Sequence, residues 1–463
     1  MMRRFALITP VVSVLALSLA AQAPAQDSVV LERDPQPKLF VTDFPWYEPN
    51  TNENGKTRQK SLACTRAVPR RAMGEITSTD YLSSDGYFGG KYKRFKSRGV
   101  DGIAFVVTDR IPDSFAGGNA LATAALAAEA DLDFFAYYDL FINTAKTSRM
   151  TLCLPGSTCP LTPGQQRIPR YNINTRPQIY DQLLEDFSNI AEHMIVPHMD
   201  EEPGRGGYLM LEDANGNRVL DENGLPRPIL AIYIARTFAD AAGNIKRLGE
   251  LMDEVTAVWN GFGLGRPAMV LDVLFWVTPS EDPIDVAYDP QIVDAFGDYA
   301  VAITWYSFFD TFQGGLRAIT NDGPRPPMSV WGKHLNQHYH QTRDEMVANG
   351  HNLMLWPGVS TQIDTRTAEN PGCRPRGVNV VYHLRDAEDW RTMLTRGLVN
   401  ASRPVIDGEA PLQSLVIVAN AGEWFEIGGL DYTPPNPRGG GCTFPFNWCE
   451  ALLDVVEEED LFP

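Results

Sequence analysis

Histidine and cysteine are scarce in this chain, with 7 histidines and 6 cysteines among 463 residues. No two cysteines have the CxxC spacing that many zinc sites use. His334 and His338 lie four residues apart in an expected helix, but Leu335 stands where the HExxH motif of metalloproteases requires Glu. We interpret the two histidines as a surface pair, and we expect neither a bound metal nor another cofactor.

Long apolar runs are absent after the first residues. No later stretch reaches the roughly 18 uncharged apolar residues that a membrane-spanning helix requires. The N-terminus combines a basic start, Met1 to Arg4, with a short apolar run, Phe5 to Leu19, and a small-residue cleavage site at Ala23-Pro24-Ala25. This pattern is typical of a secretory signal peptide over residues 1–25. We therefore expect the mature protein, residues 26–463, to be soluble and either periplasmic or secreted.

Basic residues are in the minority, because 40 Lys and Arg stand against 58 Asp and Glu, for a formal net charge of -18 at pH 7. This charge argues against nucleic acid or an anionic membrane as a partner. The one basic run, Lys91 to Arg98, lies in a predicted helix. We interpret it as a solvated helix face with Tyr92 and Phe95 turned inward rather than as a binding patch.

The six cysteines fit an exported protein, because such proteins meet oxidising conditions in which disulfide bonds persist. Cys153 and Cys159 bracket one Pro/Gly loop, and Cys442 and Cys449 bracket another. Each pair is close enough to close its own loop, which leaves Cys64 and Cys373 for a long-range bridge. Other connectivities remain open, and metal binding is the alternative use of these residues.

Eight short apolar runs bounded by turn residues are predicted to form buried strands. Their ranges are 38–47, 102–109, 133–141, 229–238, 268–276, 301–309, 353–359 and the run that begins at Leu415. Helical patterns separate most of them, at 84–98, 120–130, 178–195, 240–259, 292–299, 331–349 and 386–399. A hairpin is expected over 208–228, with turns at Asn215-Gly216 and Asn223-Gly224.

Alternation of strands and helices implies an α/β fold with parallel strands and crossover helices. Eight such strands in one chain predict a (β/α)8 TIM barrel with long decorated loops, and a doubly wound open sheet is the alternative. No linker or repeat divides the chain, so we expect a single catalytic domain over residues 26–463 with loop insertions.

Aromatic and acidic side chains collect at the predicted carboxyl ends of these strands, which converge on one pocket in a barrel. Aromatic rings pack against the C–H faces of sugars, and carboxylates and Arg bind hydroxyls. For any single aromatic residue the alternative is a place in the core. The candidate substrate-binding residues are Asp43, Trp46, Tyr47, Asp109, Tyr138, Asp139, Tyr233, Arg236, Trp276, Trp305, Tyr306, Trp356 and Trp424.

The last predicted strand ends in a small-residue turn that is followed by Glu423 and Glu426. Cleavage of a glycosidic bond requires a proton donor for the leaving oxygen and a second carboxylate. Side chains of a strand alternate between its faces, so two glutamates three residues apart share a pocket only if the chain curls after Gly422. We expect both to be catalytic; the alternative is one functional glutamate and one structural ion pair.

The segment Glu423-Trp424-Phe425-Glu426 resembles the Glu-Trp-x-Glu signature of glycoside hydrolase family 99, the endo-α-mannosidase and endomannanase family. Phe44 to Tyr47 resembles the family's first-strand Tyr-Pro-Trp-Tyr, and Gly99 to Ile103 its Ala-Gly-(Ile/Val)-Asp segment. Asn223 to Tyr233 is similar to its strand entry, Asp-Gly-Lys-Pro-Val followed by apolar residues and Tyr, and Ile427 to Pro434 to its Gly-Thr-x-Ile-Glu-Pro tail. These short patches, spread over most of the mature chain, indicate a remote relative of that family.

The resemblance implies a retaining hydrolase of a polysaccharide or oligosaccharide. Glu426 would be the general acid/base, and Glu423 the base that acts on the substrate's own 2-hydroxyl. The chain departs from the family at Gly422, where the family has Asn, and at Ile427-Gly428, where it has Gly-Thr. No residue of this chain is matched to the contacts by which the family recognises mannose. Another polysaccharide is therefore an equally good candidate substrate.

Two other functional classes are weighed against this hypothesis. A non-catalytic sugar-binding barrel is the first, and the presence of both glutamates favours the enzyme. A metal-dependent hydrolase or deacetylase is the second; it requires His and Asp at strand ends, and no strand-end His appears. Asp213, Asn215 and Asn217 alternate as in a calcium loop, but Gly is missing at the sixth position, so a hairpin turn is the simpler interpretation.

Overall fold

The computed structural model describes the strands and much of the helical layer of the protein. The described residues are 38–43, 82–97, 100–107, 111–112, 115–139, 173, 177–199, 204–213, 216–233, 235, 247–272, 290–304, 342–356, 358–359, 362–364, 381–383 and 416–418. All of them belong to one compact unit, Glu32–Pro463. The predicted signal peptide, all six cysteines, His334 and His338 lie outside the described residues.

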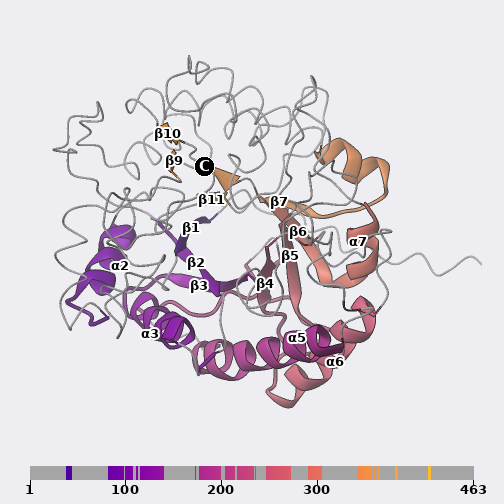
Figure 1. Ribbon diagram of the computed structural model, residues 1–463, viewed down its shortest axis with the longest axis horizontal. Coiled ribbons are helices and arrows are strands. Elements are labelled where there is room, and N and C mark those ends of the chain that lie inside the picture. The colour runs from indigo at the N-terminus through magenta and orange to yellow at the C-terminus, as the bar shows by residue number, and fades with distance from the viewer. Residues whose placement is uncertain are drawn as a thin grey trace, which may run out of the picture. The chain divides into compact units, whose positions relative to one another are not determined.

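A nine-stranded, entirely parallel sheet forms the centre of this unit (Figure 1). In spatial order its strands are β7 (Met354–Trp356), β6 (Ala300–Thr304), β5 (Ala268–Asp272), β4 (Ile229–Ile232), β3 (Asp133–Tyr138), β2 (Gly102–Val107), β1 (Leu39–Asp43), β11 (Val416–Val418) and β8 (Gly358–Val359). Strands β1 to β7 are short, largely apolar and buried, as expected for a sheet covered on both faces. A separate antiparallel pair joins β9 (Gln362–Asp364) and β10 (Val381–His383). The prediction of an α/β fold with parallel strands is confirmed.

The two ends of this strand order come from one short stretch of sequence. β7 pairs with β6, and β8 pairs with β11, yet only Pro357 separates β7 from β8. Residues 354–359 therefore border both the β6 side and the β11 side of the sheet. A sheet paired in this way must curl strongly.

In the described part of the chain, α-helices pack around the curled sheet, among them α2 (Tyr87–Ser97), α3 (Phe115–Glu129), α5 (Pro177–Ile190), α6 (Leu248–Gly261) and α7 (Pro290–Phe296). Figure 1 shows them in an arc outside the strands. A π-helical turn, Ala191–Ile195, extends α5 to the predicted end of that helix. Within the described part of the chain, none of the helices has the length and apolar character needed to cross a membrane.

Aromatic rings show which face of the sheet is concave. Phe135 of β3 contacts Phe40 of β1 and Trp356 of β7, with ring centroids 5.4 Å and 5.9 Å apart. Several strands lie between β7 and β1, so rings from these strands meet only because the sheet wraps around them. These side chains form the inner core.

The outer face packs against the helices. Phe105 of β2 contacts Tyr92 of α2, with ring centroids 6.0 Å apart, and Phe134 of β3, at 5.8 Å. Phe134 and Phe135 are neighbours in sequence and point to opposite faces, as the alternation of side chains along a strand requires. The indole of Trp259 in α6 donates to the carbonyl oxygen of Phe187 in α5 (3.1 Å), which joins two helices of the outer layer.

The predicted hairpin over 208–228 is confirmed. Isolated antiparallel bridges pair Met210 with Pro228, Glu212 with Arg218 and Leu220 with Pro226. Gly216 and Gly224 have φ values of +77° and +74°, which glycine adopts without strain at both predicted turns. The Asp213 carboxylate accepts the backbone N–H of Asn217 (2.9 Å), as in a turn.

Candidate active site

A buried tyrosine–aspartate contact lies at the carboxyl end of the concave face. The hydroxyl of Tyr137 in β3 donates to the carboxylate of Asp272, the last residue of β5. Strand β4 lies between β3 and β5, and its residue Ala231 is paired with Tyr137 in the register. The small alanine side chain leaves room for the phenol ring to reach across β4. Burial raises the pKa of Tyr137 well above its usual value, and the negative charges of Asp272 and Asp139 raise it further. The phenol therefore remains a hydrogen-bond donor at neutral pH.

Two more residues of the inner face share the level of Asp272. Asp272 is paired in the register with Thr304 of β6, and Thr304 with Trp356 of β7. The Thr304 hydroxyl donates to the carbonyl oxygen of Trp356 (2.9 Å). The Trp356 side chain is 1% exposed and packs on Phe135. Its indole N–H is buried and has no hydrogen-bond partner among the residues that the structure describes.

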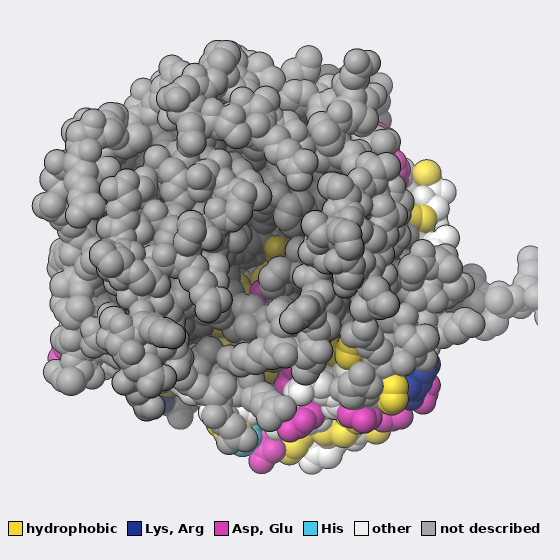
Figure 2. Space-filling view, in the orientation of Figure 1, with side chains coloured by type: hydrophobic (Ala, Val, Ile, Leu, Met, Phe, Trp, Pro, Cys, Tyr) yellow, Lys and Arg dark blue, Asp and Glu magenta, His cyan; other side chains and the backbone are white. Residues whose placement is uncertain are grey.

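Asp139 and Tyr233 lie just beyond the carboxyl ends of β3 and β4. The backbone N–H of Asp139 donates to the carbonyl of Val107 (2.9 Å), and that of Tyr233 to the carbonyl of Tyr138 (3.0 Å). Asp139 is 8% exposed and Tyr233 is half-buried, whereas Asp272 is fully buried. Figure 2 looks into a hollow in which hydrophobic and acidic side chains are visible.

Asp43 makes its described contacts on the outer face, with helix α2. Its carboxylate accepts hydrogen bonds from Lys91 Nζ (2.7 Å) and from the Tyr92 hydroxyl (2.7 Å). The side chains of Asp43 and Lys91 are each 1% exposed, so the ion pair is buried. Burial, and then the charge of Asp43, raises the pKa of Tyr92 well above its usual value. These contacts join β1 to α2, and the role of Asp43 in substrate binding stays a prediction.

The interpretation of the basic run as a solvated helix face is corrected at Lys91. Lys93 and Lys96 are exposed, and Tyr92 and Phe95 are buried as predicted. Lys91 is buried as well, with its ammonium group 5.3 Å from the centroid of the Phe88 ring. Asp43 supplies the negative charge that stabilises a buried lysine, a partner that the local sequence does not reveal.

Tyr138 also faces the helices rather than the concave side. Its hydroxyl donates to the carboxylate of Asp186 in α5, and its ring lies 5.1 Å from that of Phe187. Gln182 of the same helix donates to the other oxygen of Asp186 (2.8 Å). Of the predicted substrate-binding residues that the structure describes, Asp139 and Trp356 belong to the inner, carboxyl-end layer, and Tyr233 lies beside it.

Most of the predicted site residues come after the described strands in the sequence and are not part of them. Glu423 comes five residues after Val418, the last residue of β11. The residues outside the described ranges are Trp46, Tyr47, Asp109, Arg236, Trp276, Trp305, Tyr306, Glu423, Trp424 and Glu426. Their roles stay predictions.

Sequence reasoning missed Tyr137, Asp272 and Thr304. The fifth strand is predicted to run to Trp276, so Asp272, the last described residue of β5, is not expected at a strand end. Tyr137 stands two residues before Asp139, and the period-two alternation of a strand places the two on one face. The spacing between Tyr137 and Asp139 is therefore enough to identify Tyr137 as an inner-face residue. No pattern in the sequence identifies Thr304 in the same way.

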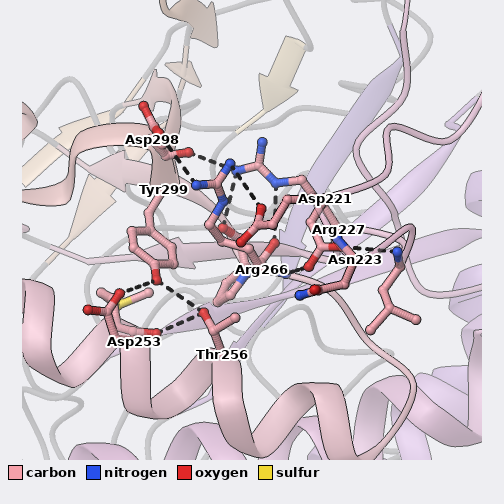
Figure 3. A network of polar contacts seen from close by, with 12 residues as sticks. Asp221, Asn223, Arg227, Asp253, Thr256, Arg266, Asp298 and Tyr299 are labelled. Carbon is pink, nitrogen blue, oxygen red and sulfur yellow. Dashed lines mark hydrogen bonds and ion pairs between the residues drawn. The ribbon is translucent and has the colours of Figure 1, made fainter. Parts of the chain in front are cut away.

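The amino-terminal edge of the sheet carries a different polar network (Figure 3). The buried guanidinium of Arg227 donates to the carbonyl oxygens of Arg266 (3.2 Å), Pro267 (3.4 Å) and Asp298 (2.9 Å). Burial, together with the neighbouring Arg266, lowers the pKa of Arg227 to about 10. These residues come just before β4, β5 and β6, at the edge where barrel residues serve stability rather than chemistry.

Asp221 completes this amino-edge network. Its carboxylate accepts the backbone N–H groups of Asn223 (2.9 Å), Leu225 (3.0 Å) and Arg266 (3.1 Å). Burial alone would raise the pKa of Asp221, but the backbone donors, with the charge of Arg266, lower it below its usual value. The side chain thus ties the hairpin to the chain segment that precedes β5.

Among the described residues, no group of three or more His, Cys, Asp or Glu is arranged to hold a metal ion. The inner layer of this part of the chain instead combines acids, aromatic rings and a buried indole N–H. Such a layer is suited to binding hydroxyl groups and apolar ring faces.

No family model matches the sequence, and no curated protein matches it significantly. Among solved structures, a glycoside hydrolase-like protein is 11% identical with a TM-score of 0.53, and the alignment covers 92% of this chain and 95% of that one. The family 99 endo-α-mannosidase of Bacteroides thetaiotaomicron is 12% identical with a TM-score of 0.44, covering 93% and 98%. A family 39 glycoside hydrolase of Bacteroides cellulosilyticus is 9% identical with a TM-score of 0.39, covering 92% and 65%. The first of these similarities shows a shared fold.

Proposed function

We propose that the protein is an exported, retaining glycoside hydrolase, a remote relative of family 99, that cleaves a polysaccharide or oligosaccharide. The observation that carries the proposal is the inner, carboxyl-end layer of Tyr137, Asp139, Asp272 and Trp356 on a curled parallel sheet. The fold shared with a glycoside hydrolase-like protein agrees with it.

The proposal includes closure of the sheet into a (β/α)8 barrel. Residues 354–359 act in it as one seventh strand, paired with β6 through β7 and with β11 through β8. β11 is then the eighth strand and pairs with β1 on its other side. Closure aims the carboxyl ends of all eight strands at one pocket, including the end that leads to Glu423 and Glu426.

In the proposed reaction, Glu426 protonates the glycosidic oxygen as the bond to C1 breaks. Glu423 removes the proton of the substrate's 2-hydroxyl, whose oxygen attacks C1 from the opposite face and forms a 1,2-anhydro sugar. Glu426, now ionised, then takes a proton from water as the water oxygen adds to C1 and reopens that ring, while Glu423 returns its proton to O2. Two inversions at C1 give overall retention.

The proposal is tested on the mature protein, residues 26–463, with a panel of neutral and charged polysaccharides and an assay for new reducing ends. We expect hydrolysis of at least one polysaccharide by the wild type. Glu426→Gln should lower kcat by roughly 10²- to 10⁴-fold, the usual contribution of general acid–base catalysis, without loss of sugar binding. Unchanged turnover in this variant refutes the role of Glu426. Binding without hydrolysis by the wild type identifies a sugar-binding protein instead.

A further inference from the structure

We infer that Tyr137 and Asp272 form a positioning pair that holds the carboxylate of Asp139 where it binds a hydroxyl of the sugar. The inference rests on the glycosidase function proposed above. It assigns Asp139 to direct contact with substrate, and Tyr137 and Asp272 to the support of that contact.

The covalent path from Tyr137 to Asp139 is short. The two residues are separated by Tyr138 alone, and alternation along the strand places them on the concave face. The hydroxyl of Tyr137 is bonded to Asp272 on β5, so the carboxyl end of β3 is tied to β5 across the intervening β4. This contact restrains the end of β3, and with it the backbone that leads to Asp139, relative to β5.

Burial separates the roles of the two acids. Asp272 is fully buried, whereas Asp139 keeps 8% of its surface exposed and lies next in chain order to the end of β3. The Tyr137 hydroxyl donates to Asp272, and Asp139 follows Tyr137 by two residues at the end of the same strand. Asp139 is therefore the acid of this cluster that substrate can reach.

A second polar group of the same inner layer also points to a ligand. The indole N–H of Trp356 is buried and finds no hydrogen-bond partner in the described part of the chain, and Trp356 lies at the same height in the sheet as Thr304 and Asp272. A buried donor without a partner costs free energy, and native proteins retain few of them. A sugar hydroxyl both donates and accepts, so it satisfies donors and carboxylates alike.

The matched pair of variants is Tyr137→Phe and Tyr138→Phe. Each removes one hydroxyl that donates to a buried aspartate, and the two positions are adjacent on β3. Michaelis constants are measured on the best polysaccharide of the panel, together with the melting temperature of each variant. A purely structural defect lowers the fraction of folded enzyme, and thus the apparent kcat, but leaves KM unchanged.

We expect Tyr137→Phe to raise KM on the order of 10-fold with kcat within about twofold, because loss of the hydrogen bond to Asp272 leaves Asp139 less well positioned to bind the sugar. Tyr138→Phe should lower the melting temperature and leave KM unchanged. Asp272→Asn keeps an oxygen that accepts the Tyr137 hydroxyl, so its KM should stay near the wild-type value. Asp272→Ala should raise KM as Tyr137→Phe does.

An unchanged KM in Tyr137→Phe, or an equal rise in both tyrosine variants, overturns the positioning pair. If Tyr137→Phe fails to fold, the contrast between Asp272→Asn and Asp272→Ala decides the same question, and equal KM values overturn the inference. A wild type that cleaves no polysaccharide refutes the proposed function, and the inference falls with it. The wild-type control therefore separates the two failures.

Discussion

Tyr137 and Tyr138 are neighbours on β3 with the same chemistry and opposite surroundings. Each donates its hydroxyl to a buried aspartate, but Asp272 lies on the inner face of the sheet and Asp186 on a covering helix. The inner contact lies at the same height in the sheet as Thr304 and Trp356, whereas Tyr138 of the outer contact packs against Phe187. Under the proposed function, the face that a polar pair occupies, and not the type of pair, decides whether it supports substrate binding or the attachment of a helix.

The cluster of Asp43, Lys91 and Tyr92 is another polar contact on the outer face of the sheet. It joins β1 to α2 as Tyr138 and Asp186 join β3 to α5. Although Asp43 ends a strand at the carboxyl edge, its described partners lie in the helical layer. A carboxylate at a strand end can thus join a strand to a covering helix in this fold.

The largest stability effect is expected for Lys91→Met. Removal of one partner leaves the Asp43 charge buried and uncompensated, which costs roughly 3–5 kcal/mol of unfolding free energy. Urea unfolding at pH 7 measures the loss. Lys93→Met is the matched control on the same helix, because Lys93 and its partner Asp85 are exposed. This control should change stability by less than about 0.5 kcal/mol.

The same variant sharpens the contrast between the faces. If the outer cluster is structural, the folded fraction of Lys91→Met binds substrate with the wild-type KM. A KM that rises in Lys91→Met as much as in Tyr137→Phe would erase the distinction between the faces and would place Asp43 in the binding site after all.

A smaller effect is expected at the amino-terminal edge, from Asp221→Ala. The change removes an acceptor for three backbone N–H groups and should lower the unfolding free energy by about 1 kcal/mol at pH 7. KM should not change, because this edge lies away from the carboxyl ends of the strands. Glu222→Ala, at the exposed neighbouring residue, is the control and should be nearly neutral.

The pH dependence of this difference follows from the lowered pKa of Asp221. A carboxylate whose folded-state pKa lies below its unfolded value of about 3.9 stabilises the protein above that pH. The contribution is lost as the pH falls through the folded-state pKa. The stability gap between wild type and Asp221→Ala should be full at pH 7 and shrink below about pH 4. A gap that is constant down to pH 3 would contradict the role of the ionised carboxylate.

The sequence revealed where strands begin better than where they end. Asp133, Ile229 and Ala268 are the predicted and the observed first residues of β3, β4 and β5. β3 and β4 end earlier than predicted, at Tyr138 and Ile232 rather than at Phe141 and Phe238. Apolar and aromatic residues continue past the last ladder hydrogen bond, and composition alone does not mark the point where the chain leaves the sheet.

Long-range pairing was beyond the reach of local patterns. The prediction of one strand over 353–359 gave no sign that its two halves pair with opposite sides of the sheet. Likewise, the charge of Lys91 suggested solvent, because its partner Asp43 lies 48 residues away. In both cases tertiary contacts override what a short window of sequence indicates.

The most direct test of the proposed chemistry is the anomeric configuration of the first product, followed by NMR during the first minutes of hydrolysis of the best polysaccharide. We expect the newly formed reducing end to appear with the configuration of the bond that was cleaved, and the other anomer to grow in later by mutarotation. Initial appearance of the inverted anomer would contradict the assigned roles of Glu423 and Glu426.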